Sequence, residues 1–234
     1  WSNMHPQYCR SADPDAVHDI MVQENHGSST APGGEKEPPR GKTLPLGCDI
    51  HVIRDDGQHL RTLPWGRTPQ EFAQGHQCWR GTTRYAITST TSYPEPACTE
   101  GYLIESEPLP FSDHLGAELG GLRNRLCNGV SGTLFSHFAT DRSGRYLVTD
   151  ALENPDEFLT HGAPARDGLY LFELDAPGAG PALKRTFLLR PGVSWKHGMH
   201  SHPFLSPDGR CAFFNSDESG TLHAYMIRNL PVSP

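Results

Sequence analysis

A weak internal repeat constrains the fold of this 234-residue chain more than any other feature. Four short segments each begin with a histidine, and each is followed by a polar turn and a run of apolar or β-branched residues. The leading histidines recur after 71, 61 and 65 residues. A repeat of this length, with strands at a fixed phase, is typical of small β-sheets stacked around a common axis. The four segments are 5–8, 76–79, 137–140 and 202–205.

The runs that follow each segment predict further strands. We therefore predict an all-β fold, a single β-propeller domain over 1–234 with about four blades. Because four units seldom complete a ring and the last unit stops after its third strand, we expect the chain to be the C-terminal part of a longer propeller. Second strands are predicted at 18–22, 85–88, 146–149 and 211–214, third strands at 49–53, 101–104, 168–172 and 222–226, and fourth strands at 59–63 and 184–188. The approximate blades are 1–70, 71–130, 131–193 and 194–234.

Segments between these strands are predicted to be loops. Residues 27–41 are rich in Gly, Pro and Ser and low in apolar residues, which is typical of a loop between two strands of one blade. The segment 112–125 is the one stretch with a helical pattern, and its Gly120-Gly121 pair weakens that pattern.

Charge and cysteine content favour some classes of partner over others. The net charge is −7 and no block of Lys and Arg occurs, which argues against a nucleic-acid-binding surface. No run of about 18 apolar residues predicts a membrane span. The six cysteines form no CxxC motif, which favours reduced thiols, and no signal peptide follows Trp1. We expect a cytoplasmic protein, and the sequence leaves its oligomeric state open.

A cluster of histidines near the C-terminus indicates a metal site. His197, His200 and His202 lie within six residues, and the last two would leave the same face of an extended strand. Imidazole pairs of this kind suit zinc, manganese, iron, copper or nickel, and the spacing does not choose among them. The alternative is a polar loop whose histidines bind no metal.

The propeller geometry predicts that residues from separate blades share one pocket. The innermost strand of each blade begins near the central axis, so the leading residues His5, His76, His137 and His202 are expected to converge there. The alternative for His5 is a hydrogen bond to the wall of the pore.

Cationic side chains close to these histidines would suit a carboxylate ligand. Arg80 and Lys196 lie near the predicted pocket in sequence, as does His26 at the end of a second strand. Arg84 is interpreted as a solvated turn residue, and Arg80 has the same alternative.

These motifs resemble those of the oligogalacturonate lyases, polysaccharide lyase family 22. The resemblance rests on Met4-His5-Pro6-Gln7, on Gly75-His76 with Trp79, on His137 with its Asp141-Arg142-Ser143-Gly144 turn, and on His200-Ser201-His202-Pro203 with the turns 206–209 and 217–220. It implies a seven-bladed propeller with manganese in a central pocket, of which this chain would supply about four blades. It also implies metal ligands at His137, His200 and His202, with His197 at a position where the family has glutamine. A fourth imidazole could favour zinc, iron or nickel over manganese.

The resemblance further implies a metal-dependent lyase that cleaves oligogalacturonate or a related uronate oligosaccharide by β-elimination, as in pectin degradation. We expect His76 to be the base, with His26 as the alternative, and an acidic oligosaccharide to be bound by Arg80, Lys196 and His5. The segment 76–79, His-Gln-Cys-Trp, keeps only the histidine and tryptophan of the family motif, so the substrate could differ. A non-catalytic propeller of the TolB-like or peptidase-associated type, acting as a binding scaffold, is the alternative function. A third reading is an inactive fragment that lacks part of the pocket.

Overall fold

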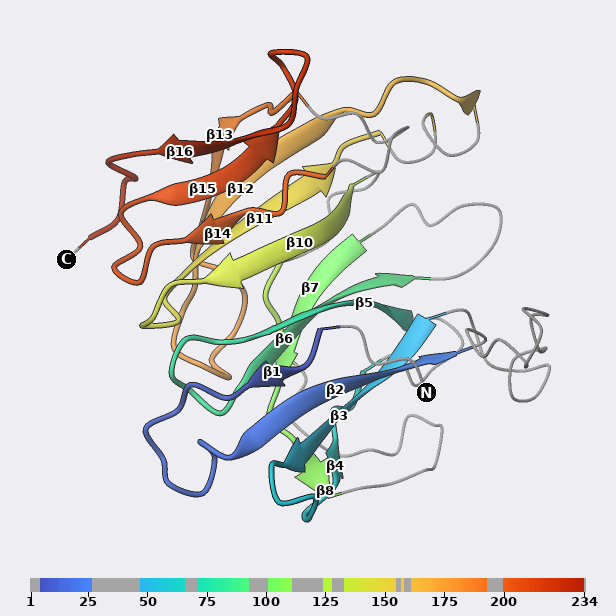
Figure 1. Ribbon diagram of the computed structural model, residues 1–234, viewed down its shortest axis with the longest axis vertical. Helices are drawn as coiled ribbons and strands as arrows, with labels where there is room; N and C mark the ends of the chain where they lie inside the picture. Colours follow the sequence, from blue (N-terminus) through green and yellow to red (C-terminus); the bar gives the residue numbers. More distant parts are fainter. Residues whose placement is uncertain are drawn as a thin grey trace.

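The chain forms an all-β structure in which short antiparallel sheets stand side by side (Figure 1). The computed structural model describes residues 5–26, 47–65, 71–92, 101–110, 124–127, 133–154, 157, 161–192 and 200–233. Within these ranges the strands make four sheet units, and this confirms the predicted propeller-type fold class.

Each unit is an antiparallel set of strands taken in chain order. The first contains β1 (Gln7–Tyr8), β2 (Asp19–His26), β3 (Gly47–Arg54) and β4 (Arg61–Thr62). The second contains β5 (Glu71–Trp79), β6 (Ala86–Ser92), β7 (Gly101–Ser106) and β9 (Asn124–Arg125), and β8 (Leu109–Pro110) pairs with β4. The third contains β10 (Leu134–Thr140), β11 (Tyr146–Leu152), β12 (Asp167–Glu173) and β13 (Lys184–Leu189). The fourth contains β14 (Phe204–Leu205), β15 (Ala212–Ser216) and β16 (His223–Ile227). We call these units blades 1 to 4.

Blades 1 and 2 are hydrogen-bonded into one nine-stranded sheet, but their connection is slight. The ladder between β3 and β5 consists of one residue pair, Cys48 with Ala73. The eight-residue ladder between β2 and β3 shows by contrast how strands pair inside a blade. We therefore treat the two blades as separate units that meet at one edge.

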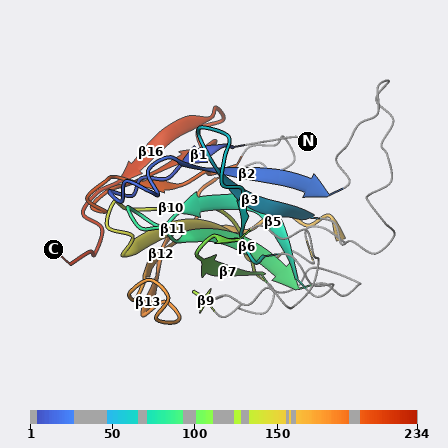
Figure 2. The same cartoon turned by 90° about the horizontal axis from the view of Figure 1, so that it is seen from below.

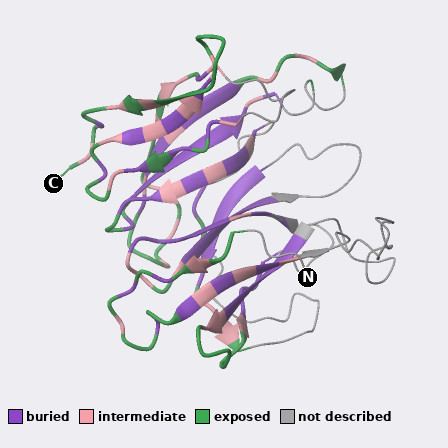
Figure 3. Cartoon of the chain, viewed as in Figure 1, coloured by how far each residue is buried: buried purple, intermediate pink, exposed green. Residues whose placement is uncertain are grey.

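Burial is greatest in the middle strands of blades 2 and 3 and is low in the outer strand of blade 3 (Figure 3). Every residue of β7 and β11 is buried, as expected for strands whose sheets are covered on both faces. The outer strand β13 is exposed at Lys184 and Arg185, and Phe187 is about half exposed. The same gradient explains why the β-branched and aliphatic runs form the middle of each blade.

The apolar core lies between neighbouring blades rather than within one of them. A large cluster joins residues of blades 1, 2 and 3, with Trp65 and Trp79 among its largest buried side chains. A smaller cluster joins blades 3 and 4, where Val148 and Leu171 meet Leu205. The blades are thus held side by side by burial of apolar surface. Figure 2, seen from below, shows the sheets in the same side-by-side arrangement.

Most of the predicted strands are confirmed, with small shifts at their ends. Blade 2 also has a short fourth strand, β9, at Asn124–Arg125. The helical pattern predicted over 112–125 is wrong at these two residues, and its other residues lie outside the described ranges. The predicted loop 27–41 also lies outside them. No helix in the described part of the chain is long and apolar enough to cross a membrane.

Candidate metal centre

Two of the four leading histidines lie at irregularities inside a strand rather than at its first residue. The β5–β6 ladder shifts register between Ala73 and Gln77, and His76 lies in this interval. The β10–β11 ladder shifts between Phe135 and Phe138, and His137 lies in that interval. Such bulges leave a residue without a cross-strand partner and often redirect a side chain near a binding site. Blades 2 and 3 therefore present a histidine at corresponding bulges.

The other two leading histidines have a left-handed backbone. His5 has a φ of 74° and His202 a φ of 42°, values that are uncommon outside glycine. Each precedes a two-residue inner strand, β1 or β14. The four histidines therefore correspond in position, with His76 and His137 at bulges and His5 and His202 just before a strand.

Three histidines from two blades come together to form a candidate metal centre. One ring nitrogen from each of His137, His200 and His202 lies within 4.8 Å of the others. The ring centroids of His137 and His202 are 3.8 Å apart, and those of His137 and His200 are 5.1 Å apart. The extended strand expected at His200 and His202 does not form, because β14 begins only at Phe204. Convergence is achieved instead through the left-handed turn at His202.

Asp150 on β11 fixes the orientation of His137. One carboxylate oxygen accepts the backbone N–H of His137 at 2.7 Å, and the other lies 2.9 Å from its Nδ1. Ser201 donates its hydroxyl to the second oxygen at 2.7 Å. Burial alone would raise the pKa of Asp150, but the hydrogen bonds from His137 and Ser201 hold this pKa below its ordinary value. An ionised carboxylate can only accept, so Nδ1 of His137 carries a proton and Nε2 is the ring nitrogen that remains to bind a metal.

The residues present fit a divalent transition metal. Burial, together with the neighbouring His137, lowers the pKa values of His200 and His202, which keeps both imidazoles in the neutral form that binds metals. Nitrogen ligands of a tetrahedral zinc ion lie about 3.4 Å apart. The three ring nitrogens lie within 4.8 Å of one another, so each pair would have to approach by at most about 1.4 Å, which side-chain rotation can supply. Imidazole suits zinc, iron, copper and nickel, while manganese more often takes additional oxygen ligands.

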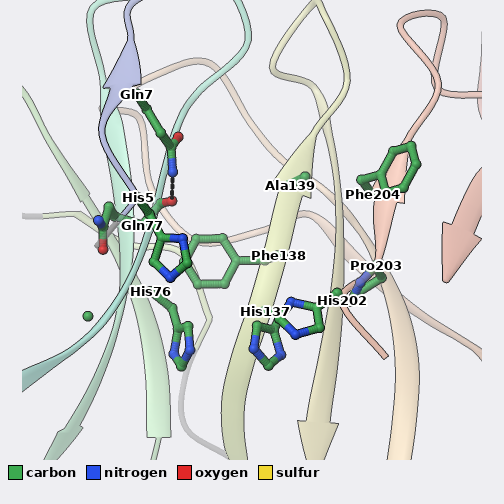
Figure 4. A pocket seen from close by; sticks show the side chains of 11 residues that line it. His5, Gln7, His76, Gln77, His137, Phe138, Ala139, His202, Pro203 and Phe204 are labelled. Carbon is green, nitrogen blue, oxygen red and sulfur yellow. Dashed lines mark hydrogen bonds between the residues drawn. The ribbon is translucent and has the colours of Figure 1, made fainter. Parts of the chain in front are cut away.

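A cavity of about 260 Å³ lies beside the candidate metal centre (Figure 4). All four leading histidines line it, together with residues of β1, β5, β10 and β14. Figure 4 shows His137 and His202 next to each other, with His76 facing them across the cavity from β5. The predicted convergence of the leading histidines is therefore present in the structure.

His76 has the electrostatic environment of a neutral base. Its ring centroid lies 4.6 Å from that of His137. Burial, and then the proximity of His137, lower the pKa of His76 to about 4. Gly75, which precedes it, has a φ of 91°, and a Cβ there would lie 2.6 Å from Nε2 of Gln23. The bulge that presents His76 thus depends on a glycine at this position.

Arg80 does not reach the cavity, and its predicted role as a substrate clamp is wrong for this structure. The side chain is 1% exposed and pairs with the fully buried Glu105 at 2.5 Å. Its Nε donates to the carbonyl oxygen of Gly144 at 2.9 Å, and a terminal nitrogen donates to the carbonyl oxygen of Asp175. These contacts use the guanidinium to connect blade 2 with blade 3. No Lys or Arg occurs among the described residues that line the cavity.

Three other predicted site residues are not placed. Lys196 and His197 lie outside the described residues. The backbone of His26 ends β2 opposite Gly47, but its side chain lies outside the described part. Their roles as substrate clamp, metal ligand and alternative base remain predictions, and so does the substrate contact of His5.

The sequence reasoning missed Asp150 and Ser201. A signal for Asp150 was present, because an acidic residue in the otherwise apolar and Thr-containing strand Tyr146–Leu152 has to be paired when it is buried. A second group of possible metal-binding residues, Glu24, Asp49 and His51, lies on β2 and β3, but Nε2 of His51 is already 3.3 Å from the Glu24 carboxylate.

The fold and the cavity together define a propeller-type all-β protein with a histidine-lined central site. Several solved structures resemble it in fold, including the following three. An oligogalacturonate lyase in complex with manganese matches 98% of this chain and 49% of its own length, with a TM-score of 0.59 and 18% sequence identity. The oligogalacturonate lyase of Vibrio parahaemolyticus matches 97% and 49%, with a TM-score of 0.60 and 15% identity. A tricorn protease matches 96% of this chain and 21% of its own, with a TM-score of 0.52 and 10% identity.

The chain thus spans about half the length of the lyases that it resembles. No family model and no curated protein sequence matches it. At 10–18% identity the likeness concerns the fold, and function has to be argued from the site.

Proposed function

We propose that this chain carries the metal centre of a divalent-metal-dependent lyase acting on oligogalacturonate or a related uronate oligosaccharide. The observation that supports this most directly is the convergence of His137, His200 and His202 beside a cavity that also contains the buried, neutral His76. The likeness in fold to a lyase in complex with manganese supports the same class.

His137, His200 and His202 would hold the ion, with manganese first and zinc, iron or nickel as alternatives. When bound, such an ion supplies Lewis-acid neutralisation of the substrate carboxylate. His137 offers Nε2, because its Nδ1–H is directed to Asp150. The described ring nitrogens leave further coordination positions for oxygen ligands, which suits a site that also binds a carboxylate.

His76 would act as the general base. The proton next to a uronate carboxylate becomes removable once the negative charge of that carboxylate is neutralised. The neutral His76 imidazole accepts this C5 proton, the C–H electron pair forms the C4–C5 double bond, and the C4–oxygen bond breaks. Transfer of a proton from water to the departing oxygen completes the elimination and gives an unsaturated sugar.

A pairing of metal analysis with an activity assay tests this function. The purified chain is compared with a His200→Ala/His202→Ala variant by elemental analysis after loading with Mn²⁺ or Zn²⁺, and by absorbance near 235 nm on oligogalacturonate. We expect about one metal ion per chain and unsaturated product from the wild type alone. Metal binding without product would reject oligogalacturonate as the substrate of this chain, while the proposed metal centre would stand.

A non-catalytic binding scaffold is the competing function. The match to a tricorn protease shows that the same type of sheet arrangement also occurs in a protein of another class, so the fold alone does not decide between the two functions. A scaffold has no need of a transition metal at His137, His200 and His202. Absence of stoichiometric metal in the wild type would therefore reject the lyase and favour the scaffold.

A further inference from the structure

We propose that Asp150 is the positioning residue of the metal centre, aligning ligands that come from two different blades. It lies in the middle of β11, is fully buried, and contacts both the His137 side and the His200–His202 side of the centre. This inference rests on the metal site of the proposed function and adds a residue to it.

Asp150 fixes His137 at two points. Its two oxygens accept the backbone N–H and Nδ1–H of the same histidine, at 2.7 and 2.9 Å. The backbone bond replaces the cross-strand partner that the bulge removes at His137. The side-chain bond sets both the tautomer and the plane of the ring, so that Nε2 is directed away from β11.

The same carboxylate also reaches blade 4. Ser201, between the two remaining ligands, is fully buried and donates its hydroxyl to the oxygen that also accepts from His137. The carbonyl of Ser201 accepts the N–H of Asn215 at 2.7 Å, which anchors the segment to β15. One carboxylate therefore fixes the spacing between His137 and the His200–His202 segment.

A neutral side chain in place of Asp150 could not make all of these hydrogen bonds. Three donors, two from His137 and one from Ser201, converge on Asp150. An asparagine offers one acceptor oxygen and an amino group that would face donors, so at least one of these bonds is lost. Partners of this kind in other metal sites contribute about 10–100-fold to metal affinity.

The test compares Asp150→Asn with a matched control, Glu105→Gln. Glu105, on β7, is another fully buried carboxylate, and it pairs with Arg80 rather than with a histidine. Binding of Mn²⁺ and Zn²⁺ is measured by calorimetry at a temperature where both variants are folded. We expect about 10–100-fold weaker binding for Asp150→Asn and wild-type affinity for Glu105→Gln.

A second measurement without metal separates this inference from the proposed function. The ¹⁵N chemical shifts of His137 report which ring nitrogen carries the proton. We expect protonated Nδ1 in the wild type and a mixture of tautomers in Asp150→Asn. If Asp150→Asn does not fold, Ser201→Ala, which keeps both bonds to His137, is expected to weaken metal binding to a smaller extent.

The outcomes are distinct. Wild-type metal affinity in folded Asp150→Asn, or equal loss in Glu105→Gln, would overturn the positioning role. Absence of metal binding in the wild type would overturn the proposed function. In that case the ¹⁵N shifts of His137 still decide whether Asp150 sets its tautomer.

Discussion

Replacing Arg80 by alanine is expected to destabilise the fold strongly, because the change leaves a buried charge without its partner. Glu105 is 0% exposed and its carboxylate has Arg80 at 2.5 Å, with the N–H of Gly178 at 2.9 Å on the other oxygen. Removing one member of a buried ion pair typically costs about 3–5 kcal/mol. For a chain of this size each kcal/mol lowers Tm by about 2–4 °C, so a decrease of about 6–20 °C is expected.

Urea unfolding followed by circular dichroism measures the loss in the free energy of unfolding. Two further variants serve as controls. Arg84 lies close to Arg80 in the sequence, and its exposed guanidinium is 3.5 Å from the Asp13 carboxylate. Arg84→Ala is therefore expected to lower the free energy of unfolding by less than about 1 kcal/mol. Arg80→Ala/Glu105→Gln leaves no buried charge unpaired, so it is expected to be no less stable than Arg80→Ala alone. If Arg80→Ala were as stable as the wild type and instead weakened oligogalacturonate binding, the structural role would be refuted.

Three further results are expected at the site. His76→Ala should lower kcat by about 10²–10⁴-fold while metal is retained, as measured by the 235 nm assay and elemental analysis. Because the pKa of His76 is lowered to about 4, its imidazole stays neutral as the pH falls from 7 to about 5, so kcat/KM should decline only toward pH 4, and an acid limb at 6.5 would contradict this. His200→Ala/His202→Ala should abolish metal binding with little loss of stability in urea, since His202 is exposed and His200 is only partly buried. Gly75→Ala should cost about 1–2 kcal/mol and lower kcat, because a Cβ at a φ of 91° meets Gln23, whereas unchanged kinetics would argue against a strained bulge.

The strands of this chain were predictable because hydrophobic pattern and turn chemistry act locally. The β-rich run from Tyr146 to Thr149 follows a polar turn, which is a strand signal, and it forms the start of β11. The convergence of His76, His137 and His202 followed from the repeat, since equivalent positions of neighbouring blades meet near one axis.

The contacts of single side chains were not predictable in the same way. Arg80 lies four residues after His76, yet it faces Glu105 and blade 3 because β5 ends at Trp79. The role of Asp150 depends on register, since the β10–β11 ladder sets it opposite the bulge that carries His137. Register and bulges arise from tertiary packing, which the pattern of one strand does not encode.

The position of His76 and His137 at bulges separates the chemistry of the cavity from the stability of the blades. A residue at a bulge has no cross-strand partner whose packing it must match, so its replacement leaves the register of the neighbouring strands unchanged. The apolar contacts that hold the blades together lie between the sheets, on other residues. Evolution could therefore exchange the cavity-lining residues of such a propeller, and with them its ligand, while the sheet framework remained the same.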